Sequence, residues 1–108
     1  MKILFVCSAN KERSKTADDY FSEKYPNIEF QSAGTNINLC RKEGTNELTE
    51  DLLIWSDKVF VMEAKHFNLI KKYTNGKYGN KITVLNIPDN YKYYSQDLID
   101  ILKQKVIL

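Results

Sequence analysis

The chain has 108 residues, of which 43% are hydrophobic and 28% are charged, and its formal net charge is +2. This length and balance suit one globular domain with one core, and they exclude a long disordered chain or two full domains. No apolar run approaches the roughly 20 residues of a membrane span, and Met1 and Lys2 lead into a short apolar run rather than a signal peptide. We therefore expect a cytoplasmic protein with no membrane or nucleic-acid partner and with reduced thiols.

Apolar runs and helical stripes alternate along the chain. The predicted strands are KILFV (2–6), IEFQSAG (28–34), KVFVME (58–63) and KITVLNIP (81–88). The predicted helices are SKTADDYFSEKYP (14–26), GTNELTEDLLIWSD (44–57), AKHFNLIKKY (64–73) and SQDLIDILKQKVIL (95–108). A capping signal at Thr45 to Glu47 is expected to start the second helix. Residues 37–44, which contain Cys40, are expected to form a polar loop that leaves this thiol at or near the surface.

This alternation predicts right-handed crossovers that build a parallel sheet with helices on both faces. The expected fold class is α/β, a single-domain three-layer α/β/α architecture over residues 1–108. Its four-stranded parallel sheet is expected to have the strand order 2-1-3-4. Ligands of such sheets bind beyond the carboxyl ends of the strands, and Cys7 lies at one such end.

The segment CSANKERS (7–14) joins the first predicted strand to the first predicted helix. The backbone N–H groups of such a loop, together with a helix N-terminus, form an anion site of phosphate size. Arg13 would bind the anion with a bidentate fork, and the same field favours the thiolate of Cys7, which makes it a nucleophile. Ser14 can donate its hydroxyl proton to that thiolate, and Asn10 is the residue best able to take a positive φ in this loop.

These residues fit the Cys-x5-Arg-Ser/Thr signature, so the chain resembles the low-molecular-weight protein tyrosine phosphatases. The segments SAGT (32–35), WSDKVFVME (55–63) and IPDNY (87–91) resemble that family in the same order. The resemblance implies a phosphocysteine intermediate at Cys7, phosphate binding by the loop amides and Arg13, and structural roles for Asn10 and Ser14. It also implies that Asp89 is the general acid. The short length resembles a small bacterial and phage group of predicted tyrosine phosphatases.

The predicted catalytic residues are therefore Cys7, Arg13 and Asp89. The residues predicted to bind substrate are Ser8, Ala9, Asn10, Lys11, Glu12, Arg13, Ser14 and Tyr91. The expected substrate is a phosphorylated protein or a small aryl phosphate, and the expected product is inorganic phosphate. No metal or other cofactor is predicted. His66 has no partner at metal-ligand spacing and is expected to be a solvated side chain.

Two other functions could use the same loop. A non-catalytic module could bind phosphate or a phosphorylated protein there, although it would need neither a nucleophile nor an acid. An arsenate reductase normally needs two further cysteines close together, and this chain offers only Cys40. The chain is also markedly shorter than the family over residues 36–50, which shape the substrate pocket. Glu12 stands where some members carry a second cysteine.

Overall fold

The computed structural model describes residues 1–108. Four parallel strands form one sheet in the order β2-β1-β3-β4, so the predicted strand order is confirmed. The strands are β1 (Lys2–Cys7), β2 (Glu29–Gly34), β3 (Lys58–Val61) and β4 (Ile82–Val84). Cys7 pairs in register with Gly34 of β2, and Val6 pairs with Val61 of β3. The carboxyl end of β1 therefore lies between the corresponding ends of its two neighbours.

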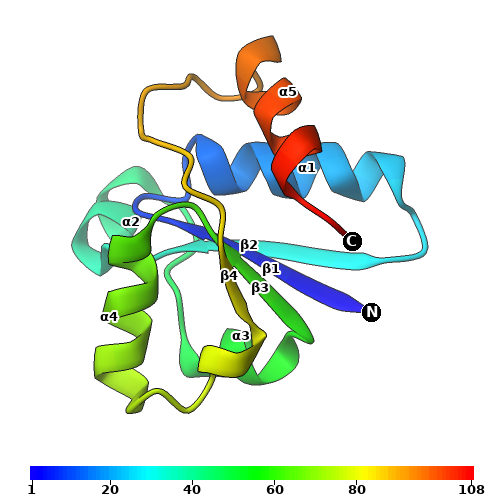
Figure 1. Ribbon diagram of the computed structural model, residues 1–108. Coiled ribbons are helices and arrows are strands. Elements are labelled where there is room, and N and C mark those ends of the chain that lie inside the picture. Colours follow the sequence, from blue (N-terminus) through cyan, green and yellow to red (C-terminus); the bar gives the residue numbers. More distant parts are fainter.

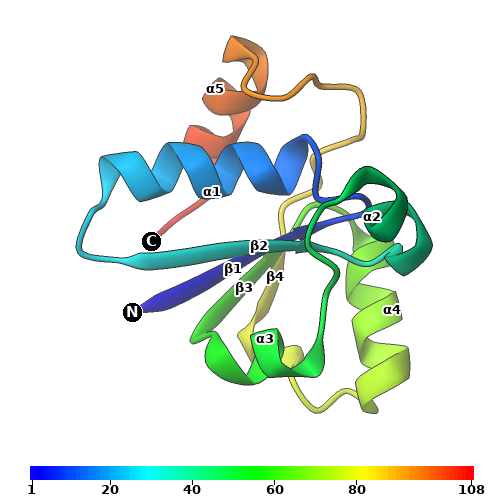
Figure 2. The same cartoon turned by 180° about the vertical axis from the view of Figure 1, so that it is seen from behind.

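Helices cover both faces of this sheet (Figure 1). They are α1 (Arg13–Lys24), α2 (Ile37–Glu43), α3 (Glu50–Trp55), α4 (Ala64–Thr74) and α5 (Gln96–Lys105), with a short 3-10 helix at Gly79–Lys81. Both views show α1 and α5 on one face and α3 and α4 on the other, while α2 lies beyond the carboxyl ends of the strands (Figures 1 and 2). The predicted three-layer α/β/α architecture is confirmed. None of these helices has both the length and the apolar content that crossing a membrane requires.

The sheet divides the core into two clusters, because successive side chains of a strand point to opposite faces. Ile3, Phe5 and Cys7 of β1 face the layer of α1 and α5, where Phe5 stacks on Phe21. Leu4 and Val6 of β1 contribute instead to the cluster on the side of α3 and α4. The alternation thus places the Cys7 side chain under α1, the helix that begins six residues later.

The segment that contains Cys40 is a helix, so the prediction of a polar loop at residues 37–44 was wrong. The Asn36 side chain accepts a hydrogen bond from Leu39 N at 3.1 Å and caps α2, and Gly44 ends the helix with φ +70°. These are ordinary helix start and stop signals. The helix is short and has no clear apolar stripe, which is why its periodicity did not reveal it.

The next helix begins later than predicted. Thr49, rather than Thr45, caps α3 by accepting a hydrogen bond from Leu52 N. Thr45 donates its hydroxyl to the Ala9 carbonyl instead, and Glu47 forms a bridge with Gly34. Residues 45–49 therefore lie outside the helix, because tertiary contacts with the loop after β1 override the local capping signal. The last strand is also shorter than predicted, since β4 ends at residue 84.

Candidate active site

The loop between β1 and α1 has the conformation that its sequence predicted. Asn10 has φ +53°, and its buried side chain braces the loop. Asn10 Nδ2 donates to Ser14 Oγ at 2.8 Å, and Asn10 Oδ1 accepts from Asn46 N at 3.1 Å. Ser14 Oγ lies 3.0 Å from Cys7 Sγ and 3.5 Å from the Ala33 carbonyl. Because Ser14 Oγ already accepts from Asn10, its own proton is best placed for the closer Cys7 sulfur.

The carbonyl groups of the first residues of this loop are hydrogen-bonded to the chain behind it. The carbonyl oxygens of Cys7, Ser8 and Ala9 accept hydrogen bonds from residues in 35–45, which lie behind the loop. The N–H groups of residues 8–13 donate to no acceptor in the protein. Unpaired N–H groups are costly unless water or a ligand accepts from them. The loop is therefore a cradle whose remaining hydrogen-bonding capacity suits an anion.

Arg13 closes this cradle from the first residue of α1. Its side chain is only 2% exposed, and Nη1 donates to Glu63 Oε2 at 2.5 Å and to the Ile87 carbonyl at 2.9 Å. Arg13 Nε lies 3.6 Å from Asp89 Oδ1. Burial raises the pKa of Glu63, but the hydrogen bond and charge of Arg13 outweigh it and hold that pKa below its ordinary value. The guanidinium is thus held by Glu63, which follows β3, and by the carbonyl of Ile87, which follows β4.

A cavity of about 180 Å³ lies against the cradle. Its lining residues are Cys7, Ser8, Ala9, Lys11, Glu12, Arg13, Leu39, Glu43 and Asp89. The three residues predicted to be catalytic therefore line one cavity, with Cys7 and Arg13 in the loop after β1 and Asp89 in the distant segment after β4. Most residues predicted to bind substrate line it as well. Asn10 and Ser14 do not line it, because both are buried behind the loop.

Tyr91 is a third predicted substrate-binding residue that does not line this cavity. It packs against the core cluster on the side of α1 and α5. Part of the cavity wall is formed instead by Leu39 and Glu43 of α2, with Glu43 Oε2 3.3 Å from Lys11 Nζ. Neither residue was predicted to line the site, because residues 37–44 were expected to form a loop where α2 lies.

Gly34 is required where the loop crosses the end of β2. A Cβ atom at this position would lie closer than 3.0 Å to the Ser8 carbonyl oxygen and to Cys40 Sγ. Neither contact is one that real Cβ atoms make. The absence of a side chain at residue 34 therefore lets the loop lie directly on the sheet, and the predicted strand end at SAG has a structural reason.

His66 is buried rather than solvated, so that prediction was wrong. Its side chain is 0% exposed, and its two ring nitrogens lie 3.0 Å from Glu63 N and 2.9 Å from Ser8 Oγ. Burial, reinforced by the charge of Arg13, lowers the pKa of His66 from 6.5 to about 4. Glu63 and His66 were both missed as site residues. The helix start at residue 64 was predicted, and the E-x-x-H spacing across it is the capping-box signal that could have indicated a role for this pair.

Cys40 is also buried, contrary to the expected thiol at or near the surface. It is 0% exposed, and its sulfur lies 3.7 Å from the Ser8 carbonyl oxygen, behind the cradle. Burial raises the pKa of Cys40. Both cysteines are free thiols. Cys40 thus supports the loop from behind.

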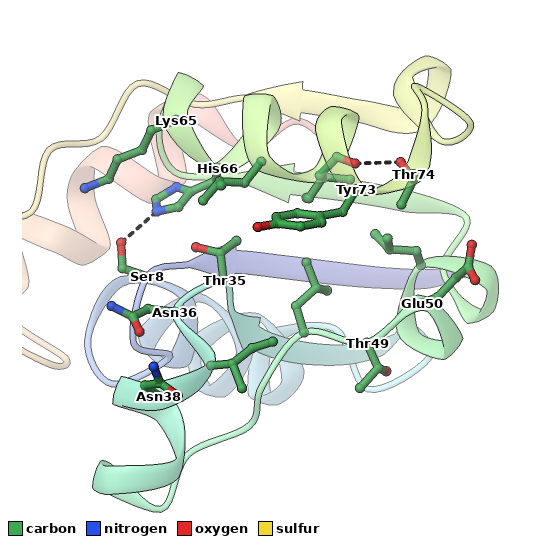
Figure 3. Close-up of a pocket in the computed structure, with 15 residues that line it drawn as sticks. Ser8, Thr35, Asn36, Asn38, Thr49, Glu50, Lys65, His66, Tyr73 and Thr74 are labelled. Carbon is green, nitrogen blue, oxygen red and sulfur yellow. Dashed lines mark hydrogen bonds between the residues drawn. The ribbon is translucent and has the colours of Figure 1, made fainter.

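A larger cavity of about 670 Å³ opens on the other side of Ser8 (Figure 3). It runs between α4 and residues 35–53, and its lining includes Ser8, Thr35, His66, Leu69 and Tyr73. Figure 3 shows the His66 ring reaching Ser8 at one end of this groove. Ser8 lines both cavities, whereas Cys7 lines only the small one. No group of three or more His, Cys, Asp or Glu side chains is arranged to hold a metal ion.

Comparison of the sequence with known proteins finds a local similarity. No family model matches the chain. The low molecular weight protein-tyrosine-phosphatase PtpB of Staphylococcus aureus is 42% identical to it over 53 residues. The match covers 49% of this chain and 37% of PtpB, so it spans little more than a third of that relative's length.

Solved structures share the fold over nearly the whole chain. The tyrosine phosphatase Wzb from Escherichia coli K30, in complex with phosphate, has a TM-score of 0.76 at 23% identity and covers 96% of this chain and 91% of its own. YwlE arginine phosphatase from Geobacillus stearothermophilus has a TM-score of 0.68 at 21% identity, with coverage of 96% and 91%. A cysteine-to-serine variant of a YwlE arginine phosphatase, with a TM-score of 0.64, 23% identity and coverage of 97% and 86%, carries phosphate on its active-site serine. The chain is thus similar in sequence to a low-molecular-weight protein tyrosine phosphatase over about half of its length, in agreement with the predicted resemblance, and it shares the fold of these solved structures.

Proposed function

We propose that this protein is a phosphomonoester hydrolase of the protein tyrosine phosphatase type that acts through a phosphocysteine intermediate at Cys7. One observation carries the proposal: Asp89 lines the same cavity of about 180 Å³ as Cys7 and Arg13, although it lies more than 70 residues away from their loop in the sequence. The unpaired N–H groups of residues 8–13 support it, because a phosphoryl group supplies the acceptors that they lack. The local similarity to PtpB supports the same reaction class.

In the first step, the Cys7 sulfur attacks phosphorus and the bond from phosphorus to the ester oxygen breaks. The loop N–H groups and Arg13 bind the non-bridging oxygens, whose charge they stabilise as the phosphoryl group transfers. Ser14 donates a hydrogen bond to the Cys7 thiolate across 3.0 Å. Asp89 gives its proton to the leaving oxygen, which would otherwise depart as an anion.

In the second step, water attacks the phosphocysteine and the phosphorus–sulfur bond breaks. Asp89, now ionised, accepts a proton from that water, which is the reverse of its first role. The products are inorganic phosphate and the Cys7 thiolate. Asp89 is well placed to exchange protons with solvent, since its side chain is 58% exposed.

The proposed substrate is a phosphotyrosine side chain in a protein or a small aryl phosphate. Phosphoarginine is a second candidate, because the carboxylates of Glu12, Glu43 and Asp89 line the cavity beside the phosphate cradle. Carboxylates at that position would attract a cationic leaving group such as a guanidinium. The fold is shared with both tyrosine and arginine phosphatases, so it does not favour either substrate.

The test is hydrolysis of an aryl phosphate, phosphotyrosine peptide and phosphoarginine peptide by the wild-type chain and by Cys7→Ser. We expect turnover by the wild type and none by the variant, because serine is a much weaker nucleophile. A binding module would hydrolyse none of these substrates, yet inorganic phosphate would still protect Cys7 from alkylation. Arsenate reduction has weak support, since Cys40, the only other thiol, is buried behind the loop.

A further inference from the structure

The first turn of α4 holds both ends of the phosphate cradle. Glu63, the residue before the helix, binds Arg13 Nη1 at 2.5 Å. His66, three residues later, reaches Ser8 Oγ with Nε2 at 2.9 Å. The reaction described above uses Arg13 and the loop amides, but it assigns nothing to the His66 ring or to the Ser8 hydroxyl. A histidine that is 0% exposed and has both nitrogens engaged is a specific arrangement that calls for a role.

The proton on the His66 ring can be placed from its neighbours. The backbone N–H of Glu63 points at Nδ1 over 3.0 Å, and a backbone N–H can only donate. Nδ1 is therefore the unprotonated acceptor nitrogen, and the neutral ring carries its proton on Nε2. The low pKa of His66, caused first by burial and then by the charge of Arg13, keeps the ring in this neutral form at neutral pH.

This tautomer fixes the role of the Ser8 hydroxyl. Nε2–H donates to Ser8 Oγ, so one lone pair of that oxygen is occupied and its own proton is free to be donated. His66 is the one hydrogen-bond partner of Ser8 Oγ in the protein. Ser8 follows Cys7 directly and lines the small cavity as well as the groove in Figure 3.

We propose that His66 is a positioning residue that holds the Ser8 hydroxyl as a hydrogen-bond donor to the phosphoryl group in the cradle. The proposal rests on the function proposed above, since it adds a side-chain donor to the loop amides and Arg13. A hydroxyl that would otherwise rotate freely is held on one side by the ring, so less freedom is lost when phosphate binds. The donor also acts on a charged acceptor, where a hydrogen bond is strong.

Two substitutions separate this role from a structural one. In His66→Asn, the side-chain oxygen can replace Nδ1 as the acceptor for Glu63 N, but no donor reaches Ser8. In His66→Gln, the side-chain amide can replace Nε2 as the donor to Ser8, while the acceptor for Glu63 N is lost. Ser8→Ala removes the hydroxyl itself. Lys71→Gln, at an exposed position on the same helix, is the matched control.

The measurement is the concentration of inorganic phosphate that halves the rate of Cys7 alkylation by iodoacetate, together with KM and kcat for an aryl phosphate. We expect His66→Asn and Ser8→Ala each to weaken phosphate protection by roughly tenfold to a hundredfold, the usual range for a hydrogen bond to a charged group. Phosphate protection should weaken clearly less in His66→Gln than in His66→Asn. The double variant Ser8→Ala with His66→Asn should lose no more than either alone, because the two residues act as one unit.

The proposal is overturned if phosphate protects Cys7 in Ser8→Ala as well as it does in the wild type. It is also overturned if phosphate protection is weaker in His66→Gln than in His66→Asn. The latter result would mean that His66 serves only to cap α4. Thermal unfolding of each variant shows whether a loss of phosphate protection is due to unfolding. If both His66 variants unfold, Ser8→Ala still tests the proposal. Because alkylation needs no turnover, failure of hydrolysis with intact phosphate protection would reject the proposed function and leave this inference standing.

Discussion

The guanidinium of Arg13 lies 2.5 Å from the carboxylate of Glu63, measured from Nη1 to Oε2, although the two residues are 50 positions apart. The same nitrogen donates to the Ile87 carbonyl, whereas Nη2 has no partner in the protein. The side chain of Arg13 is 2% exposed and that of Glu63 is 29% exposed. The arginine fork is therefore oriented by the protein before any phosphoryl group binds, and part of it remains free for a ligand.

Replacing Arg13 with Lys should lower kcat more than it raises KM. An ammonium is a point charge that cannot bind Glu63 and a phosphoryl group with one planar fork. The lost contacts are those that strengthen in the transition state, so we expect a decrease in kcat of roughly 10²- to 10³-fold. Steady-state kinetics with an aryl phosphate measure both constants. An increase in KM with kcat unchanged would contradict this role.

Replacing Glu63 with Gln should destabilise the protein by about 1 to 3 kcal/mol, because the buried guanidinium loses a charged partner. Urea unfolding at neutral pH gives the free energy directly. The matched control is Lys65→Gln, since Lys65 Nζ is exposed and lies 3.7 Å from the same carboxylate. Such an exposed pair contributes little, so the control should change the free energy of unfolding by less than about 1 kcal/mol. Equal effects of the two substitutions would show that the Arg13 contact is not special.

Replacing Asp89 with Ala should slow phosphoryl transfer by roughly 10²- to 10⁴-fold for a poor leaving group, the usual range for general acid catalysis. The loss should shrink as the leaving group becomes more acidic, because such a group needs less protonation. A series of aryl phosphates with different phenol pKa values measures this trend. Asp97→Ala is the control, since Asp97 lies in the first turn of α5 and does not line the cavity. The same modest defect for every leaving group would remove Asp89 as the acid.

Replacing Gly34 with Ala should destabilise the protein by about 1 to 3 kcal/mol, the usual range for overpacking a filled site. The new methyl group would collide with the Ser8 carbonyl and with Cys40 Sγ, so the loop must move and phosphate protection of Cys7 should weaken as well. Gly79→Ala is the matched control, because nothing lies within 4 Å of a Cβ there. Urea unfolding and iodoacetate alkylation test both effects. If the two alanine variants behave alike, the contact at Gly34 is tolerated.

Acidification from pH 7 to pH 4 should remove about 3 kcal/mol of stability through His66 alone. Burial and the charge of Arg13 lower the pKa of His66 to about 4, whereas the unfolded chain has the ordinary value near 6.5. Between these values the unfolded state binds more protons, so the free energy of unfolding falls as the pH falls. Urea unfolding of the wild type and of His66→Gln across this range isolates the effect. Parallel pH profiles for the two proteins would show that His66 does not titrate in this way.

The alternation of apolar runs and helical stripes was enough to predict the α/β class, the parallel sheet and the position of Cys7 at a strand end. These features depend on which faces must be buried and on the handedness of crossovers, and both follow from local sequence. The positive φ of Asn10 was also predicted, because few residues tolerate that conformation in a short loop without glycine.

Tertiary structure alone decided that Thr45 and His66 contact the loop that forms the cradle. Thr45 carries a local capping signal, yet the loop after β1 claims its hydroxyl, and α3 begins at residue 50 instead. His66 occurs in a polar stretch and was expected to be solvated, but its ring is buried and lies within hydrogen-bond distance of Ser8. Periodicity reports which residues are buried by their own element, whereas hydrogen bonds between segments 30 or more residues apart depend on how the strands are ordered in the sheet.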